Sequence, residues 1–376
     1  MRRVLFVDDE PALLAGLRRM LFPLRQEWHT AFADGAARAL ELLDREPFDV
    51  IVADMRMPEM SGAELLTEVT RKYPHMVRMI LSGTWDRDLR MQAAVTAHRY
   101  LPKPCDSETL TSVVNRACPP WAVPANQPLR NLITRLNSLP SAPGALNRLV
   151  GVLRSPDPSI RDAADLVADD MALSAKVLQL VNSSFIGTRR QIANAREAVA
   201  YVGVDSLRTL ALSVGAFSSL EEGESSLFSP AALQAHAVAV ARSAGAIVKA
   251  ENAPRSVQDE TMTAGLLHDV GKLVLAANFR EDYEKALTAA ENMPLCDAER
   301  EVFGATHAEV GAYLLWLWGL PDTVVEAAAC HHDPSAGSSE GWTPLTAVCQ
   351  AHCFAGEAGG AGAQRGYDRQ ALFDLR

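Results

Sequence analysis

Four short apolar runs near the start of the chain each end in a polar or charged side chain, and no other feature constrains the fold as much. The runs cover residues 4–7, 50–53, 78–81 and 99–102, and they are followed by Asp8-Asp9, Asp54, Ser82 and Lys103. Continuous apolar runs bounded by turns are typical of strands buried on both faces of a parallel sheet. In such sheets, ligands bind outside the carboxyl ends of the strands. We therefore expect three carboxylates, a hydroxyl and an ammonium group to converge at one edge of a sheet.

Converged carboxylates repel one another and need a cation. Hard oxygen ligands with open positions suit Mg²⁺, which keeps several waters and also binds phosphate. The pattern favours Asp54 as the nucleophile that accepts a phosphoryl group, with Asp8, Asp9 and Asp54 itself as magnesium ligands. Ser82 and Lys103 are then placed to contact phosphate oxygens, because phosphoryl transfer depends mainly on positioning and charge neutralisation. Each residue alone is an ordinary turn residue, and it is their occurrence on successive strand ends that favours a site.

Residues 1–118 resemble the receiver domain of two-component response regulators. The matched elements are Val-Asp-Asp-Glu at 7–10, Asp54 followed by Met57-Pro58 and Met60-Ser61-Gly62, Ser82-Gly83, and Tyr100 three residues before Lys103-Pro104. The resemblance implies an α/β, doubly wound, parallel five-stranded fold, phosphorylation of Asp54 by a cognate histidine kinase, and dependence on Mg²⁺. It also implies a switch in which Ser82 moves toward the phosphate and Tyr100 turns inward. Receivers commonly have a cis peptide bond at Lys-Pro, and they often form homodimers through one face.

Length and charge limit the remaining function classes. A chain of 376 residues is long for one core, so two or three domains are expected. The net charge of −10 argues against a general nucleic-acid-binding surface. No helix-turn-helix-like module is evident, so direct DNA binding is not expected. No apolar stretch reaches the roughly 18–20 residues that span a bilayer, and no secretory segment follows Met1. We therefore expect a cytoplasmic protein without a membrane partner, with its six cysteines reduced.

The strand signal stops near residue 118, and helical periodicity dominates from there on. Prolines at 119, 120, 124 and 128 predict a short stiff linker over residues 119–128. We expect an all-α domain over residues 129–355, with an HD-like subregion at about 233–355. The Gly/Ala-rich end, residues 356–376, is expected to be a flexible tail.

Six of the nine histidines lie beyond residue 235, and they suggest a second site. The six are His236, His268, His307, His331, His332 and His352. Asp269 follows His268 directly, and Lys272 comes one helical turn later. Imidazoles with a carboxylate on helices suit Mn, Fe or Zn, and a metal pair would activate water and clamp a phosphodiester, with Lys272 steadying a phosphate. A single helical histidine is more commonly structural, so the metal-site and core interpretations both stay open.

The helical region resembles the HDOD branch of the HD superfamily over about residues 129–355. The matches are Leu139-Pro140, Ser155-Pro156-Asp157, Asp170 leading into residues 173–178, Asn182-Ser183-Ser184-Phe185, and residues 198–203. HDOD domains are relatives of HD phosphohydrolases whose catalytic residues have often decayed, and many act by protein interaction. The resemblance implies a mostly α-helical output domain with a signalling role.

This chain keeps more of the HD residues than a fully decayed copy would. It is similar to the HD-GYP phosphodiesterases, which cleave cyclic di-GMP, at His236, His268, Asp269, Lys272, His307 and His331-His332. Three features depart from that pattern. The Gly-Tyr-Pro signature is replaced by residues 333–337, and Ala232 stands where an acidic residue is usual. The late aspartate ligand is not obvious, although His352 falls near its place.

Two main functions follow, with a non-catalytic metal or nucleotide sensor as a third alternative, and whether the output domain is an enzyme stays open. In the first, phosphorylation of Asp54 controls an HDOD domain that acts mainly through an unknown downstream protein partner. In the alternative, the chain is a phosphorylation-regulated, metal-dependent phosphohydrolase whose ligand is a cyclic dinucleotide or another nucleotide. The retained His/Asp cluster favours the enzyme, whereas the missing signature and late aspartate favour the protein-interaction function, which we expect.

Overall fold

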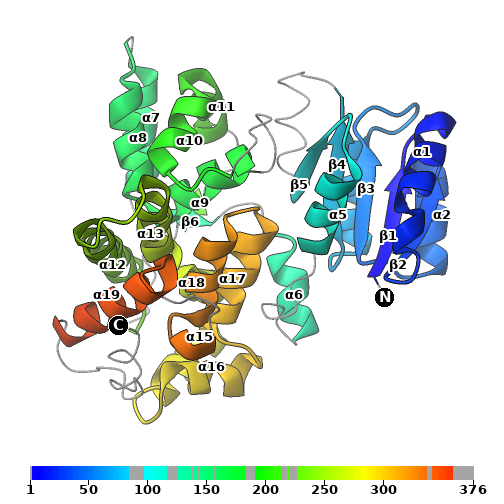
Figure 1. Ribbon diagram of the computed structural model, residues 1–376. Coiled ribbons are helices and arrows are strands. Elements are labelled where there is room, and N and C mark those ends of the chain that lie inside the picture. The colour runs from blue at the N-terminus through cyan, green and yellow to red at the C-terminus, as the bar shows by residue number, and fades with distance from the viewer. Residues whose placement is uncertain are drawn as a thin grey trace.

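The chain folds into an α/β domain followed by a mostly helical domain, as predicted (Figure 1). The computed structural model describes residues 2–83, 97–116, 126–136, 139–141, 144–155, 157–182, 191–212, 218–219, 227–336 and 341–358. The predictions for the side chains of Ser82 and Tyr100, for most of the linker and for residues 359–376 of the tail fall outside what is described.

The α/β domain is built on a five-stranded parallel sheet. Its strands are β1 (Arg2–Val7), β2 (Trp28–Ala33), β3 (Val50–Asp54), β4 (Val77–Ser82) and β5 (Arg99–Pro102), in the order β2-β1-β3-β4-β5. The predicted apolar runs are thus strands, and the expectation of five parallel strands is confirmed. Strands β2 and β5 are the two edge strands, and in Figure 1 β5 lies on the side of the sheet that faces the helical domain.

Helices cover both faces of this sheet, which explains why its strands are apolar on both sides. Helices α1 (Pro11–Leu21) and α5 (Ser107–Arg116) share one buried cluster with the sheet, and α2 (Ala36–Arg45) and α3 (Gly62–Lys72) share the other. A short 3₁₀ helix, η1 (Phe22–Leu24), follows α1. Ser61 and Glu64 form a capping box that fixes the start of α3.

The second domain consists mainly of helices. These are α6 (Gln127–Ile133), α7 (Ala145–Arg154), α8 (Ile160–Ala168), α9 (Met171–Leu180), α10 (Ala195–Val202), α11 (Val204–Leu212), α12 (Pro230–Ala250), α13 (Arg255–Leu267), α14 (Val270–Asn278), α15 (Arg280–Ala289), α16 (Leu295–Phe303), α17 (His307–Leu317), α18 (Asp322–Cys330) and α19 (Pro344–Ala358), with a 3₁₀ turn, η3, at Pro334–Ala336. The expectation of an all-α domain needs one correction, because β6 (Pro140–Ser141) and β7 (Ser218–Ser219) form a short parallel pair.

Helix α12 has the length and composition of a membrane-crossing segment, with a mean hydropathy of 1.3. By this criterion, the expectation that no stretch reaches spanning length was wrong. However, Ala237, Val240, Ala244 and Val248 on α12 are buried, and the helix packs against α13 and α19. The core helix of a globular bundle meets the same criterion.

Candidate phosphorylation and metal-binding sites

The sheet brings Asp8, Asp54 and Lys103 together at its carboxyl edge. Asp54 is the last residue of β3, Asp8 follows β1, and Lys103 follows β5. The Lys103 ammonium donates a 2.6 Å hydrogen bond to Asp8 Oδ2 and forms an ion pair with Asp54 Oδ1. Both carboxylates are buried, at 2% and 8% exposed. Lys103 therefore neutralises the two carboxylates, Asp8 and Asp54, that the sheet places beside each other.

The electrostatics of this edge follow from burial and from the lysine. Burial raises the pKa of the Asp54 carboxyl, and the hydrogen bond and charge of Lys103 oppose that rise without cancelling it. Burial lowers the pKa of Lys103, but its hydrogen bonds to Asp54 and Asp8 outweigh this effect and raise that pKa overall. The backbone N–H of Arg56 donates to Asp54 Oδ2 at 2.6 Å. These contacts hold the Asp54 carboxylate in one orientation at the carboxyl edge of the sheet.

Of the other predicted receiver residues, Asp9 and Ser82 lie at the same edge of the sheet. Asp9 follows Asp8 directly and is partly exposed. Ser82 ends β4, where its backbone pairs with Pro102, and Tyr100 lies on β5. The peptide bond between Lys103 and Pro104 is cis, as predicted. In the described part of the receiver, the carboxylates do not form a ready-made group of metal ligands, and Lys103 lies between Asp8 and Asp54.

A second cluster surrounds Asp269, which is completely buried in the helical domain. All six predicted histidines gather here, from the ends or inner faces of five different helices. His236 lies on α12, His268 and Asp269 between α13 and α14, His307 at the first residue of α17, His331 and His332 after α18, and His352 on α19. Thr306 and Glu309 form a capping box that starts α17 and so fixes the place of His307.

Three of these histidines are held in the same tautomer by contacts outside the cluster. Nδ1 of His268 donates to the carbonyl of Gly265 at 2.8 Å, and Nδ1 of His331 donates to the carbonyl of Ala328 at 2.9 Å. Their Nε2 atoms face Asp269, at 3.3 Å from Oδ2 and 3.4 Å from Oδ1 respectively. An imidazole whose Nδ1 proton is bound in this way directs the lone pair of Nε2 at a ligand, which is the usual arrangement of a metal-binding histidine.

The third is His307, which is positioned by Glu299 on α16. Glu299 Oε2 accepts from the His307 backbone N–H at 2.7 Å and from Nδ1 at 2.6 Å. His307 Nε2 then lies 3.3 Å from Asp269 Oδ1. Sequence reasoning missed Glu299, because it lies eight residues before His307 on another helix and no motif marks it. Cys296 is close to the same pair, but burial raises the pKa of its thiol to about 12, which keeps it protonated at neutral pH.

The ligand atoms form two groups that share Asp269. One comprises His236, His268, Asp269 and His352, and the other comprises Asp269, His307, His331 and His332, with all ligand atoms of a group within 4.8 Å of one another. His352 Nδ1 lies 3.0 Å from Nε2 of both His236 and His268. His352 therefore occupies the region of the first group, where the sequence comparison left a late aspartate missing.

The charge balance of the cluster fits a cation. Burial lowers the pKa of His236 to about 4 and that of His331 to about 3, so both rings are neutral near pH 7. Although burial raises the pKa of Asp269, the neighbouring His268 and Lys272 hold it well below its usual value. Lys272 donates to Asp269 Oδ2 at 2.7 Å, whereas the buried Asp269 Oδ1 has no hydrogen-bond partner among the described residues. Burial lowers the pKa of His307, but the charge of Glu299 and the hydrogen bonds to Asp269 and Glu299 outweigh this effect and raise that pKa overall, so a cation would have to displace any proton on this ring. The neutral imidazoles of His236 and His331, together with an unsatisfied carboxylate oxygen, belong to a donor set that suits Mn, Fe or Zn.

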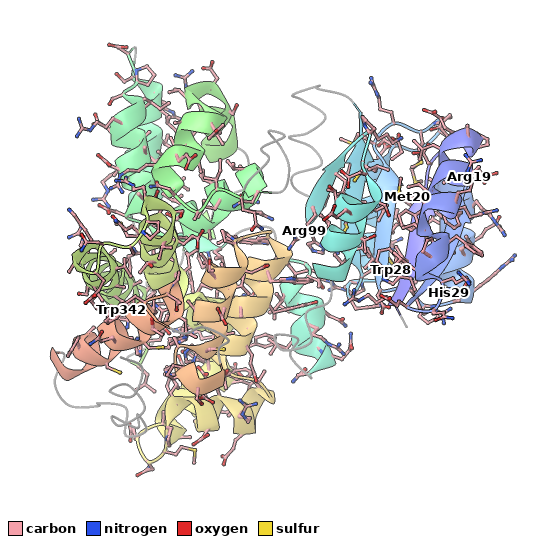
Figure 2. All side chains as sticks on the ribbon, in the orientation of Figure 1. Arg19, Met20, Trp28, His29, Arg99 and Trp342 are labelled. Carbon is pink, nitrogen blue, oxygen red and sulfur yellow. The ribbon has the colours of Figure 1, made fainter. Side chains whose placement is uncertain are left out.

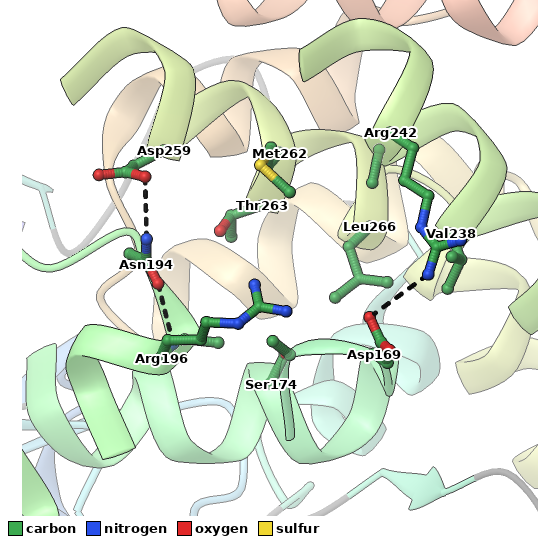
Figure 3. Close-up of a pocket in the computed structure, with 13 residues that line it drawn as sticks. Asp169, Ser174, Asn194, Arg196, Val238, Arg242, Asp259, Met262, Thr263 and Leu266 are labelled. Atoms are coloured by element: carbon green, nitrogen blue, oxygen red, sulfur yellow. Dashed lines mark hydrogen bonds and ion pairs between the residues drawn. The ribbon is translucent and has the colours of Figure 1, made fainter. Parts of the chain in front are cut away.

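A separate hollow of about 160 Å³ lies between helices α8–α10 and helices α12–α13 (Figure 3). Its polar groups are engaged within the protein. Asn194 donates to Asp259 at 2.8 Å, Arg242 lies 3.9 Å from Asp169, and Thr263 donates to a backbone carbonyl. We assign no ligand to this hollow, because its described polar groups already have partners within the protein, unlike Oδ1 of Asp269.

Comparison with known proteins places both domains. The HDOD domain family matches residues 139–334, which is more than half of the chain. The chain belongs to the HDOD family. The response regulator receiver domain family matches residues 4–115, so the protein combines a receiver with an HDOD domain, the architecture of a response regulator in two-component signalling.

Individual relatives agree with this assignment. The crystal structure of the MmoQ response regulator from Methylococcus capsulatus is 29% identical and has a TM-score of 0.50, over 63% of this HDOD protein and 97% of that chain. An uncharacterized protein of Treponema pallidum is 27% identical over 54% of this chain. The hydrogenase transcriptional regulatory protein HoxA of Cupriavidus necator is 35% identical over 30% of it. The chain matches only 39% and 23% of the lengths of these last two relatives.

Proposed function

We propose that a histidine kinase phosphorylates Asp54 and that the phosphorylated receiver controls the HDOD domain, which signals through contact with a downstream protein. The proposal is supported by the convergence of Asp8, Asp54 and Lys103 at the carboxyl edge of the sheet. Mg²⁺ would bind to Asp8, Asp9 and Asp54, and Lys103 would move from its present ion pairs to the phosphoryl oxygens. We place this activity in the cytoplasm, and a homodimer is compatible with it.

Phosphorylation at Asp54 can be tested with acetyl phosphate and Mg²⁺. Intact-protein mass spectrometry should show one added phosphoryl group on the full chain and none on Asp54→Asn. Asp44→Asn is a matched control, because Asp44 is a carboxylate of the same domain on α2. It should be phosphorylated as readily as the unmodified protein. Equal phosphorylation of the Asp54→Asn variant would contradict the assignment.

A second function is favoured by the cluster around Asp269, namely metal-dependent hydrolysis of a phosphodiester in a cyclic dinucleotide or another nucleotide. The observation that carries it is that two groups of ligand atoms share one buried carboxylate. A carboxylate shared between two histidine sets would hold two metal ions close together, and paired ions stabilise both the attacking and the leaving oxygen of a phosphodiester. When bound, a metal pair supplies an activated water and a clamp for the phosphate.

The chain's own residues divide this work between them. Asp269 would hold both ions, because its two oxygens face the two histidine groups. Glu299 keeps His307 in the ligand tautomer. Lys272 is 13% exposed at its side chain and His236 is 26% exposed, so the cluster is open on their side. The Lys272 ammonium is therefore placed to contact a phosphate oxygen of a substrate that enters there.

Metal content decides whether this second function is tenable. The full chain, purified and reconstituted with Mn²⁺ in excess Mg²⁺ that occupies the receiver, should hold one or two equivalents of Mn²⁺ by plasma mass spectrometry, and Asp269→Asn should lose them. Asp282→Asn, on the exposed face of α15, is the matched control and should keep them. Bound metal together with turnover of a cyclic dinucleotide would support the enzyme. Bound metal without turnover would leave a metal-binding signalling domain, and absence of metal from the unmodified protein would remove this second function.

A further inference from the structure

The receiver contacts the helical domain through an arginine on its edge strand. The Arg99 side chain, from the first residue of β5, is 8% exposed and reaches toward α17 (Figure 2). Its Nη2 donates to the carbonyl of Trp316 at 2.6 Å, and its guanidinium lies 5.6 Å from the centre of the Trp316 ring. Trp316 is one residue from the end of α17, where helix carbonyls carry partial negative charge. Arg99 therefore caps the C-terminal end of this helix.

A second contact links the neighbouring strand to α6. Arg78 on β4 is 1% exposed, and its Nη2 donates to the carbonyl of Thr134 at 2.6 Å, just after α6. His98 accepts from the Arg78 backbone N–H through Nδ1 at 3.0 Å, so its neutral ring carries the proton on Nε2 and donates it to the same carbonyl at 3.0 Å. Helix α6 packs against α17. The edge of the receiver is thus attached to α17 directly and through α6.

The other end of α17 belongs to the histidine cluster. His307 is the first residue of the helix, and the helix is clamped there by α14, which follows Asp269. The clamp is tight, because a Cβ atom on Gly271 would lie 1.9 Å from the carbonyl oxygen of His307. Eleven residues of helix span about 16 Å. A displacement of α17 would therefore move His307 relative to Asp269.

Lys103 links the phosphorylation site to the contact between β5 and α17. Strand β5 begins at Arg99 and is followed by Lys103, whose ammonium pairs with Asp54. A phosphoryl group on Asp54 adds negative charge and oxygen acceptors at the point where Lys103 now binds. The lysine must change its partners, and it is attached to the same four-residue strand as the arginine that caps α17.

We propose that α17 couples the phosphorylation state of Asp54 to the metal site: a change in Lys103 pairing shifts β5, Arg99 moves the C-terminal end of α17, and His307 changes its position relative to Asp269. The inference rests on the metal-binding function proposed above and names how that site is regulated. Because coupling between two binding sites is reciprocal, metal at the cluster must alter the affinity of the receiver for a phosphoryl analogue at Asp54 by the same factor.

The test measures Mn²⁺ affinity of the full chain by calorimetry, with and without beryllofluoride as the phosphoryl analogue, at constant Mg²⁺. Beryllofluoride should change the Kd for Mn²⁺ at least about fivefold, the lower end of typical allosteric couplings. Arg99→Ala should still bind Mn²⁺ but bring the ratio of the two Kd values close to one. Arg71→Ala, an exposed arginine on α3 of the same receiver, is the matched control and should keep the ratio. If Arg99→Ala does not fold, Arg99→Gln replaces it, since it removes the charge at similar length.

The outcomes separate this inference from the function it rests on. If the unmodified protein binds no Mn²⁺, the metal site itself is absent, and the metal-dependent function and its coupling to Asp54 are both refuted. If it binds Mn²⁺ with the same Kd in both states, the metal site stands and the coupling is refuted. If the Kd ratio persists in the Arg99 variant, the route through Arg99 and α17 is wrong. As a second readout, saturating Mn²⁺ should change the affinity for beryllofluoride by the same factor in the unmodified protein and leave it unchanged in the Arg99 variant.

Discussion

The close approach of α14 and α17 at Gly271 gives a sharp prediction. A methyl group at this position would lie 1.9 Å from the carbonyl oxygen of His307 and 2.8 Å from the backbone nitrogen of Gly311. Ordinary contact begins near 3.4 Å, so the two helices must separate by about 1.5 Å (3.4 − 1.9) to accommodate it. The atoms involved are backbone atoms, and no side-chain rotation can relieve the overlap. Gly271→Ala should therefore both destabilise the protein and move His307.

The size of both effects follows from this displacement. Overpacking of a well-packed core costs about 1–3 kcal/mol. For a domain of this size, each kcal/mol lowers Tm by roughly 2–4 °C, so we expect a loss of about 2–12 °C in EDTA. Metal–ligand distances tolerate only about ±0.2 Å, so a shift of 1.5 Å at His307 should weaken Mn²⁺ binding at least about tenfold. Thermal unfolding followed by circular dichroism and calorimetric titration of Mn²⁺ measure the two effects.

The matched control is Gly151→Ala. Gly151 lies in α7, and a Cβ atom there would meet nothing within 4 Å. Alanine in a helix interior is more stable than glycine by about 0.5–1 kcal/mol, so this variant should melt slightly above the unmodified protein. Its Mn²⁺ affinity should not change. A Gly271→Ala protein that melts and binds Mn²⁺ like the unmodified chain would refute the clamp between α14 and α17.

Three further predictions concern buried ionisable side chains. Glu299→Gln should weaken Mn²⁺ binding about 10- to 100-fold, because it loosens the His307 imidazole that Glu299 holds. Glu301→Gln, on the exposed side of α16, should leave Mn²⁺ binding unchanged. Equal Mn²⁺ affinities of the Glu299→Gln variant and the unmodified protein in calorimetry would rule out the positioning role of Glu299. Because the folded-state pKa values of His236 (about 4) and His331 (about 3) lie below 6.5, the metal-free protein should lose up to about 1.4 kcal/mol per pH unit and per histidine as the pH falls below 6.5. Melts between pH 7 and 4 should show this slope, and it should flatten in His331→Gln. Burial lowers the pKa of Lys176 to about 8, so Lys176→Met should raise the unfolding free energy at pH 7 by on the order of 1–3 kcal/mol, and this gain should shrink between pH 8 and 10.5.

The receiver fold, and the meeting of Asp8, Asp54 and Lys103 at its carboxyl edge, were predictable because the signals are local. An apolar run reports burial on both faces of a strand, and the residue after the run falls at the carboxyl edge whatever the loops do. Asp8, Asp54 and Lys103 could therefore be placed together before any contact was known. The sequence did not reveal that Lys103 lies between the two carboxylates, because that depends on how a flexible side chain resolves the repulsion between them.

The helical domain was predictable in part. The types and spacing of the histidines indicated a cluster around Asp269, and they also raised the question of His352. Whether His352 joins the cluster depends on the packing of α19 against α12 and α13, which the sequence does not specify. Glu299 and Arg99 were missed for the same reason. Arg99 and Trp316 lie 217 residues apart, and no sequence pattern of a strand residue or an apolar helix predicts a contact between two domains.

The cluster also ties distant parts of the chain together. His236 and His352 are separated by 116 residues, and the ligands come from five helices. An occupied metal centre would therefore act as a cross-link between segments that are far apart in the sequence of the helical domain. The binding free energy of such a centre is folding free energy, and a ligand that binds only the native state suppresses local opening in proportion to its concentration. In a cell short of the metal, the domain would open more frequently and be degraded sooner. The amount of the signalling protein would then itself depend on metal supply.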